Sequence, residues 1–286
     1  MAKKYNYNYK VVPIGKSKQI QTDWLMECTK KAIIWGFGQI DVTKPREYFR
    51  THVDDQGNTF SLTAYMAYLL AQAVLEHPHI NAYRDGRKKL VIFEDVDIVV
   101  IVERKFEGHI RPVPTVYTIR SAQKKHWKEI HYEIRESQTR KSKGLQYDKK
   151  GHKQSKSVKI LGKLPGFIRR WLLSRVMANP YKKKKFNGTI GITSVGMFLD
   201  KDQAGTGIST TPNSLTLQVG GIEKLPRYNE KGEIEPRELL NASFAIDHAV
   251  IDGGDVTRYI STMRRMFSAG HGIDFTEPAN RPEKKG

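Results

Sequence analysis

The sequence predicts an α/β domain in which helices flank a mixed β-sheet. Strand-like and helix-like apolar segments alternate along the 286 residues, and no segment repeats another. A chain of this length allows one large domain or two small ones, and no stretch is a convincing internal linker. We therefore expect a single domain over residues 1–277. Residues 278–286 are expected to form a disordered tail because they carry nothing to pack.

The first half of the chain begins its regular structure with a strand at 33–42, closed by Thr43-Lys44-Pro45. From Ser61 to about His77 the apolar residues follow helical spacing, and Pro78 ends the helix. Three further strands are expected, at 90–94, 97–103 and 112–119. The second of these is a nearly continuous β-branched run, which is typical of a buried strand. A helix with Trp127, Ile130 and Ile134 on one face follows.

The second half is predicted to hold a helix at 166–177, three strands and a closing helix. The first helix carries an apolar stripe of Phe167, Trp171, Leu172 and Val176. Strands are expected at 189–195, 214–219 and 239–246, with a turn signal at 228–232 that favours a hairpin. Asp255 is the predicted N-cap of the last helix, whose inward face would hold Val256, Tyr259, Ile260, Met263 and Phe267.

The chain is strongly basic, with 49 Lys and Arg against 30 Asp and Glu, a formal charge of +19. The positive residues concentrate between 124 and 163 and in the run 182–185. The segment near 139–163 reads as a solvated basic insertion because it is rich in Lys, Ser and Gly. Solubility and non-specific attraction for anions is the favoured interpretation. Steering of a phosphate-bearing small molecule and binding of nucleic acid are the alternatives, the last being the weakest.

Composition also excludes several classes of protein. No apolar run approaches the ~20 residues that span a membrane, and no apolar segment follows the basic start as in a signal peptide. The single cysteine, Cys28, cannot form an internal disulfide, and no Cys/His cluster has metal-site spacing. We therefore expect a soluble, cytoplasmic protein with no metal site and no membrane partner.

The stretch that carries chemistry is Asp247-His248-Ala-Val-Ile-Asp252-Gly253, between a strand and a helix. Histidine titrates near neutrality, so it can accept and return a proton at physiological pH. A strand end would hold its backbone rigidly while the imidazole faces a cleft, and Gly253 would let the turn close beneath it. On its own, this pattern favours a structural histidine in a tight turn that Asp252 caps.

The phrase nevertheless resembles a family signature. His-x-x-x-Asp-Gly between strand and helix is similar to the motif of the chloramphenicol acetyltransferase-like superfamily. It is closest to the catalytic domain of dihydrolipoamide acyltransferases, the E2 components of 2-oxoacid dehydrogenase complexes. Their pattern is Asp-His-Arg-x-x-Asp-Gly-Ala, whereas this chain has Ala249 in place of the arginine. Chloramphenicol acetyltransferases commonly carry alanine at that position.

Four other stretches support the resemblance in the same order along the chain. They are 10–18, similar to the family's entry segment with lysines for arginines; 62–83, a long helix closing in His-Pro-His-Ile-Asn-Ala; 97–114, a strand pair ending in Pro-Val-Pro; and 188–198, Gly-Thr-Ile-Gly-Ile-Thr-Ser-Val-Gly-Met-Phe. The resemblance therefore covers most of the chain and implies a two-layer α/β sandwich.

The resemblance also implies a mechanism. His248 would be the general base that deprotonates the thiol of coenzyme A or dihydrolipoamide, and Thr193 would stabilise the oxyanion. Ser194 takes that role if the alignment is off by one, and Ser194 and Gly253 are the implied substrate-binding residues. Asp252 would hold the loop through an ion pair, for which the N-terminal segment offers Lys16 and Lys18. Trimers, with His248 of one chain facing Thr193 of the next, are implied as well.

The resemblance implies coenzyme A as a substrate. The chain has no lysine in the Asp-Lys-Ala context of a lipoyl domain, so a lipoyl donor is expected on another protein, with acyl-CoA used directly as the other possibility. Two alternatives stay open: an acetyltransferase for a small hydroxyl or amine acceptor, and a catalytically weak oligomeric scaffold. The acyl pocket is expected around Trp35, Phe37 and Met197.

Overall fold

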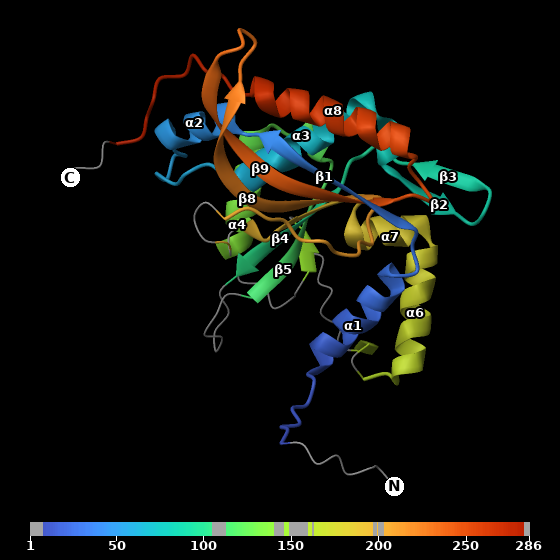
Figure 1. The fold of residues 1–286 in the computed structure, drawn as a ribbon. Coiled ribbons are helices and arrows are strands. Elements are labelled where there is room, and N and C mark those ends of the chain that lie inside the picture. The colour runs from blue at the N-terminus through green and yellow to red at the C-terminus, as the bar shows by residue number, and fades with distance from the viewer. Residues whose placement is uncertain are drawn as a thin grey trace.

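The computed structural model describes residues 8–104, 113–139, 146–148, 160–161, 163–196, 199 and 203–282. Most of the predicted basic insertion at 139–163 lies outside these residues. The described chain forms an α/β structure with helices packed on a mixed sheet, as predicted (Figure 1). Its α-helices are α1 (Lys16–Cys28), α2 (Thr43–Thr51), α3 (Leu62–Glu76), α4 (Trp127–Thr139), α6 (Gly166–Ala178), α7 (Pro180–Asn187) and α8 (Gly253–Ala269). Two short 3₁₀ helices are η1 (Pro78–Ile80) and η2 (Ala122–Lys124).

Seven strands form the main sheet in the order β1-β9-β8-β7-β4-β5-β6. They are β1 (Ile33–Asp41), β4 (Ile98–Arg104), β5 (Val113–Ile119), β6 (Gln146–Asp148), β7 (Ile190–Ser194), β8 (Leu215–Tyr228) and β9 (Ile234–Asp247). The pairs β4–β7, β7–β8 and β5–β6 are parallel and the others antiparallel. A separate antiparallel pair consists of β2 (Ala82–Asp85) and β3 (Lys89–Ile92).

One face of the sheet carries the hydrophobic core. Alternate residues of β7, β8 and β9, such as Ile192, Leu217 and Phe244, are buried there together with almost the whole of α3. Figure 1 shows α3 and α8 on this side of the sheet, whereas α1 and α6 lie side by side and extend away from it. The opposite face of β1, β9, β8 and β7 carries polar and aromatic residues, so its chemistry differs from that of the core.

The hairpin of β8 and β9 sets the register that places Asp247 at the end of β9. Asn229 starts its turn, accepting backbone hydrogen bonds from Lys231 and Glu233, and Gly232 has a φ of +78°. That φ lies in the left-handed region that favours glycine. Register then carries Asp247 to the far end of β9, where its amide nitrogen donates to the Ser214 carbonyl at 2.9 Å.

Several sequence expectations are corrected by the structure. Thr43-Lys44-Pro45 begins α2 instead of closing a strand into a loop; proline is tolerated in a first helical turn, and the Asp41 carboxylate accepts the Thr43 amide. Asp252, not Asp255, is the N-cap of α8. In β4 only alternate residues are buried and Ile101 is 46% exposed, because only one sheet face carries the core.

Two further expectations differ from the observed packing. In α6, Phe167 and Trp171 of the predicted apolar stripe are 68% and 56% exposed, and Leu173 is the buried apolar residue instead. At the C-terminus, Asn280 and Arg281 do not fray. Their amide nitrogens both donate to the Thr51 carbonyl, and the Asn280 side chain accepts from the Val53 amide at 2.8 Å. Residues 283–286 lie outside the described chain.

Candidate active site

His248 sits directly after β9, in a turn that leads into α8. Its amide nitrogen donates to the Ala32 carbonyl at 2.8 Å, at the entry to β1. The carbonyl of the preceding residue, Asp247, accepts the amides of Val250 and Ile251 at 2.9 and 3.0 Å. The turn is therefore short and held by the backbone, while the His248 side chain remains exposed.

The imidazole of His248 has a defined orientation. Its Nδ1 lies 3.0 Å from the Ile251 carbonyl oxygen. Because a carbonyl can only accept, Nδ1 carries the hydrogen and Nε2 of the neutral ring keeps its lone pair. This hydrogen bond therefore leaves the Nε2 lone pair unused.

Asp252 and Gly253 complete the motif without the contacts expected of them. Asp252 has extended backbone geometry as the N-cap of α8, but its side chain makes no cap hydrogen bond. Within the described ranges it has no ion-pair partner, and Lys18 instead donates to Gln21. Gly253 does not have a positive φ, and a Cβ built there would meet nothing within 4 Å. The expected need for glycine at this turn is therefore wrong.

Thr193 and Ser194 close strand β7 and point to opposite faces of the sheet. Thr193 pairs with Gln218 of β8, which pairs with Ser243 of β9, which pairs with Phe37 of β1. Directly paired residues share a face, so these four side chains form one row across the face opposite the core. Ser194 alternates to the helical face.

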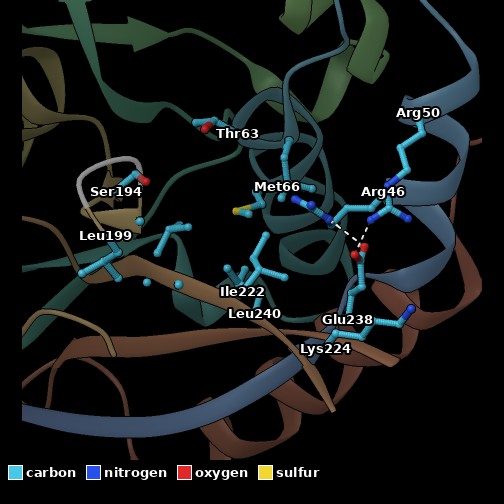
Figure 2. A pocket seen from close by; sticks show the side chains of 15 residues that line it. Arg46, Arg50, Thr63, Met66, Ser194, Leu199, Ile222, Lys224, Glu238 and Leu240 are labelled. Atoms are coloured by element: carbon cyan, nitrogen blue, oxygen red, sulfur yellow. Dashed lines mark hydrogen bonds and ion pairs between the residues drawn. The ribbon is translucent and has the colours of Figure 1, made fainter. Parts of the chain in front are cut away.

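Ser194 instead lines a cavity of about 510 Å³ between the sheet and helices α2 and α3, seen in Figure 2. Apolar side chains such as Met66 and Leu240 form much of its wall. Arg46, Arg50 and Lys224 supply three cations at the other end, where Glu238 pairs with both arginines. If the alignment were shifted by one residue, from Thr193 to Ser194, the proposed oxyanion hydroxyl would lie in this cavity instead of on the opposite face of the sheet.

Thr193 and His248 are not neighbours within one chain. Thr193 lies level with Ser243, four residues before Asp247 and two strands away. At ~3.3 Å per residue and ~4.8 Å between strands, Thr193 and Asp247 are separated by about 16 Å. The two predicted catalytic side chains therefore cannot act on the same atoms without a second chain.

The expected pocket residues Trp35 and Phe37 lie on the face that carries Thr193. Trp35 is 44% and Phe37 62% exposed. The Trp35 indole donates to the Ser209 carbonyl at 3.4 Å, in the segment that crosses this face. Met197 lies outside the described residues.

Sequence reasoning missed two polar groups at this site. Gln218 and Ser243 are buried and joined by a 3.0 Å hydrogen bond beside Thr193. Lys31 and Asp247 form a buried ion pair of 2.8 Å beneath the His248 turn. The sequence did contain a signal for them, because a polar residue within an apolar strand needs a hydrogen-bonding or charged partner when it is buried.

No group of three or more His, Cys, Asp or Glu side chains within the described residues could hold a metal ion. None of the helices in the same part of the chain has the length and apolar character needed to cross a membrane.

Known proteins resemble this chain in sequence and in fold. The family model of the 2-oxoacid dehydrogenases acyltransferase (catalytic domain) matches residues 7–157 and 172–270. The lipoamide acyltransferase component of the branched-chain alpha-keto acid dehydrogenase complex of Bacillus subtilis is 24% identical over 265 residues. That match covers 91% of this chain and 52% of the relative, so the chain spans about half the length of that protein.

Solved structures share the fold. A dihydrolipoamide acetyltransferase of Azotobacter vinelandii superposes with a TM-score of 0.65 and 15% identity, over 91% of this chain and 92% of that one. It was studied for the role of a serine, a histidine and an asparagine four positions later in its catalytic mechanism. The cubic core of a pyruvate dehydrogenase multienzyme complex gives a TM-score of 0.64 at 17% identity, over 92% of each chain. Because the family model matches most of this chain, the chain belongs to the 2-oxoacid dehydrogenase acyltransferase family and corresponds to its catalytic domain.

Proposed function

We propose that this chain transfers an acyl group between a thioester and a thiol, with coenzyme A and dihydrolipoamide as the thiol carriers. The observation that carries the proposal is the fixed imidazole of His248, whose Nδ1 is engaged by the Ile251 carbonyl at 3.0 Å. This leaves Nε2 free to accept the proton of a thiol. A thiol of pKa near 8.5 is a weak nucleophile until it is deprotonated.

The reaction follows from that role. His248 Nε2 takes the thiol proton as the sulfur attacks the thioester carbonyl, which forms a tetrahedral oxyanion. The Thr193 hydroxyl donates a hydrogen bond to this oxygen. Collapse of the intermediate breaks the original carbon–sulfur bond, and the departing thiolate recovers the proton from His248. Asp252 follows His248 by four residues, the spacing of the histidine and asparagine studied in the Azotobacter vinelandii enzyme.

The site is proposed to form between two chains of a trimer. The separation of about 16 Å between Thr193 and Asp247 within one chain supports this arrangement. The exposed Trp35 and Phe37 on the Thr193 face offer apolar area for a neighbouring chain. A similar chain builds the cubic core of a pyruvate dehydrogenase multienzyme complex, which supports a higher assembly of trimers.

The partners follow from the same chemistry. Acyl-CoA is a proposed substrate, and the charge of +19 favours approach of its phosphates. The lipoyl group is proposed to arrive on another domain or protein. We place the reaction in the cytoplasm, where the single buried thiol of Cys28 would remain reduced.

The test is thioester exchange by the purified protein. Acetyl-CoA and longer acyl-CoAs are each combined with dihydrolipoamide, and released coenzyme A is separated and quantified. The proposal expects turnover that His248→Ala abolishes. His271→Ala is the matched control because His271 is also exposed and follows the end of α8 that is far from His248, and it should retain wild-type rates.

Other results would redirect the assignment. Exchange that survives His248→Ala would reject His248 as the base. Transfer only to a small hydroxyl or amine acceptor would favour an acetyltransferase of that kind. A folded oligomer without turnover for any acceptor would favour a scaffold, and salt-sensitive binding of nucleic acid would favour the basic surface as the functional part.

A further inference from the structure

We propose that Lys31 is a positioning residue for His248: its ammonium ties Asp247 to the segment 211–213 and so holds the catalytic turn in one arrangement. The inference rests on the proposed function for its effect on rate. It concerns an ion pair formed by residues 216 positions apart, whose contact the sequence did not predict.

The Lys31 ammonium lies at the junction of three segments. Its Nζ is 2.8 Å from Asp247 Oδ2 at the end of β9. It also lies 3.3, 3.2 and 2.6 Å from the carbonyl oxygens of Thr211, Pro212 and Asn213. Carbonyls and a carboxylate only accept, and a neutral amine has two N–H donors whereas an ammonium has three, so the four acceptors around Nζ favour the protonated amine. The side chains of Lys31 and Asp247 are only 10% and 7% exposed, so water competes little for either charge.

Lys31 and the residue after it contact the chain on both sides of His248. Ala32, the next residue, accepts the His248 amide at 2.8 Å, and Asp247 immediately precedes the histidine. The second oxygen of Asp247 accepts the Ala249 amide at 3.3 Å, on the other side of His248. Ser214, which follows the clamped segment, accepts the Asp247 amide. Replacing Lys31 would therefore disturb the His248 turn in two ways. It would affect the Ala32 carbonyl, which accepts the His248 amide, and the Asp247 carboxylate, which accepts the Ala249 amide.

A second buried amine lies close by but does not replace Lys31. Lys183 of α7 has its Nζ 3.9 Å from the centre of the Tyr83 ring, a cation–π geometry. Burial lowers the pKa of Lys183 to about 7, and the neighbouring Lys31 adds to this effect. Burial likewise raises the pKa of the nearby Cys28 thiol to about 11. Between these two pKa values both groups are mainly uncharged. Burial lowers the pKa of Lys31 as well, but its ion pair with Asp247 opposes that shift, so Lys31 is the counter-charge of Asp247.

The test separates positioning from folding. Lys31→Met alone leaves a buried carboxylate unpaired, which is strongly destabilising. The informative variant is therefore Lys31→Met/Asp247→Asn, which removes both charges and keeps an oxygen for the Ala249 amide. We expect it to fold and to lose kcat by about 10- to 100-fold with KM within about threefold of wild type. Lys30→Met is the control, because the Lys30 side chain is 63% exposed and its ammonium pairs with Glu27 instead of Asp247.

A second readout does not depend on activity. Nitrogen-15 NMR of the His248 ring distinguishes Nδ1–H from Nε2–H. Wild type is expected to show the Nδ1–H form, and the double variant a mixture. Wild-type kcat in the folded double variant with an unchanged tautomer would overturn the proposal, as would failure of that variant to fold, which would make the pair structural. If wild type itself shows no exchange, the proposed function fails, and the tautomer measurement alone decides the role of Lys31.

Discussion

His248 combines an exposed side chain with a backbone fixed on both sides, which suits a group that must meet a diffusing substrate in one orientation. The resemblance located this residue, and its tautomer could only come from the structure. The Ile251 carbonyl that sets the tautomer lies three residues away, but a turn had to form before it could accept from Nδ1.

Thr193→Ala is expected to lower kcat by about 10²–10³, the usual effect of removing one oxyanion donor. Ser194→Ala is the matched control, because its side chain faces the cavity on the opposite side of the sheet. Steady-state exchange assays on both variants test the register. A large loss in Ser194→Ala with little change in Thr193→Ala would reverse the two roles.

Cys28 provides a test of burial at a single side chain. It is the only cysteine, it is 0% exposed, and burial raises its pKa to about 11. The thiol should therefore resist iodoacetamide at about pH 8 in the native protein and react fully in guanidinium. Mass spectrometry counts the adduct. Rapid native labelling would contradict the packing of α1 against the rest of the molecule.

At the scale of elements, the helices and strands with clear periodicity followed from the sequence. Helix α3 is the clearest case: the sequence starts it at Ser61, which is its N-cap and accepts the Ala64 amide. Helix α2 was missed because Thr43-Lys44-Pro45 reads as a break, whereas in the structure the Asp41 carboxylate accepts the Thr43 amide at the start of the helix. The stripe on α6 had the right period, but the helix packs through Leu173 and leaves Trp171 exposed.

Helix α7 should make stability depend on pH through Lys183. Burial holds its folded pKa at about 7 against 10.5 as the ordinary value, so between these pH values the unfolded state binds a proton that the folded state does not. The free energy of unfolding should then rise with pH over this window. Lys183→Met should make that rise smaller. Denaturant titrations at about pH 7 and 9.5 measure it.

The exposed neighbour Lys182 supplies the control for that experiment. Lys182→Met should keep the wild-type dependence, because it removes a neighbouring charge and leaves the buried Lys183 amine in place. Equal slopes in wild type and Lys183→Met would mean that Lys183 is charged in the folded protein at neutral pH.

At the scale of the whole molecule, the sequence could name candidate residues but not their partners. Lys31 and Asp247 lie far apart in the chain, and so do Gln218 and the Phe37 of its row. Such contacts arise only once strand order and register are known. The separation of His248 from Thr193 is of the same kind, since it depends on which strands lie between them.

The most direct measurement is complementation between two inactive variants. His248→Ala and Thr193→Ala are co-expressed with different tags, and assemblies carrying both tags are assayed for exchange. In a mixed cyclic trimer one interface pairs an intact His248 with an intact Thr193, so about a quarter to a third of wild-type activity should return. Each variant alone should stay nearly inactive. Mixed assemblies that show no more activity than the two parents would contradict a site built from neighbouring chains.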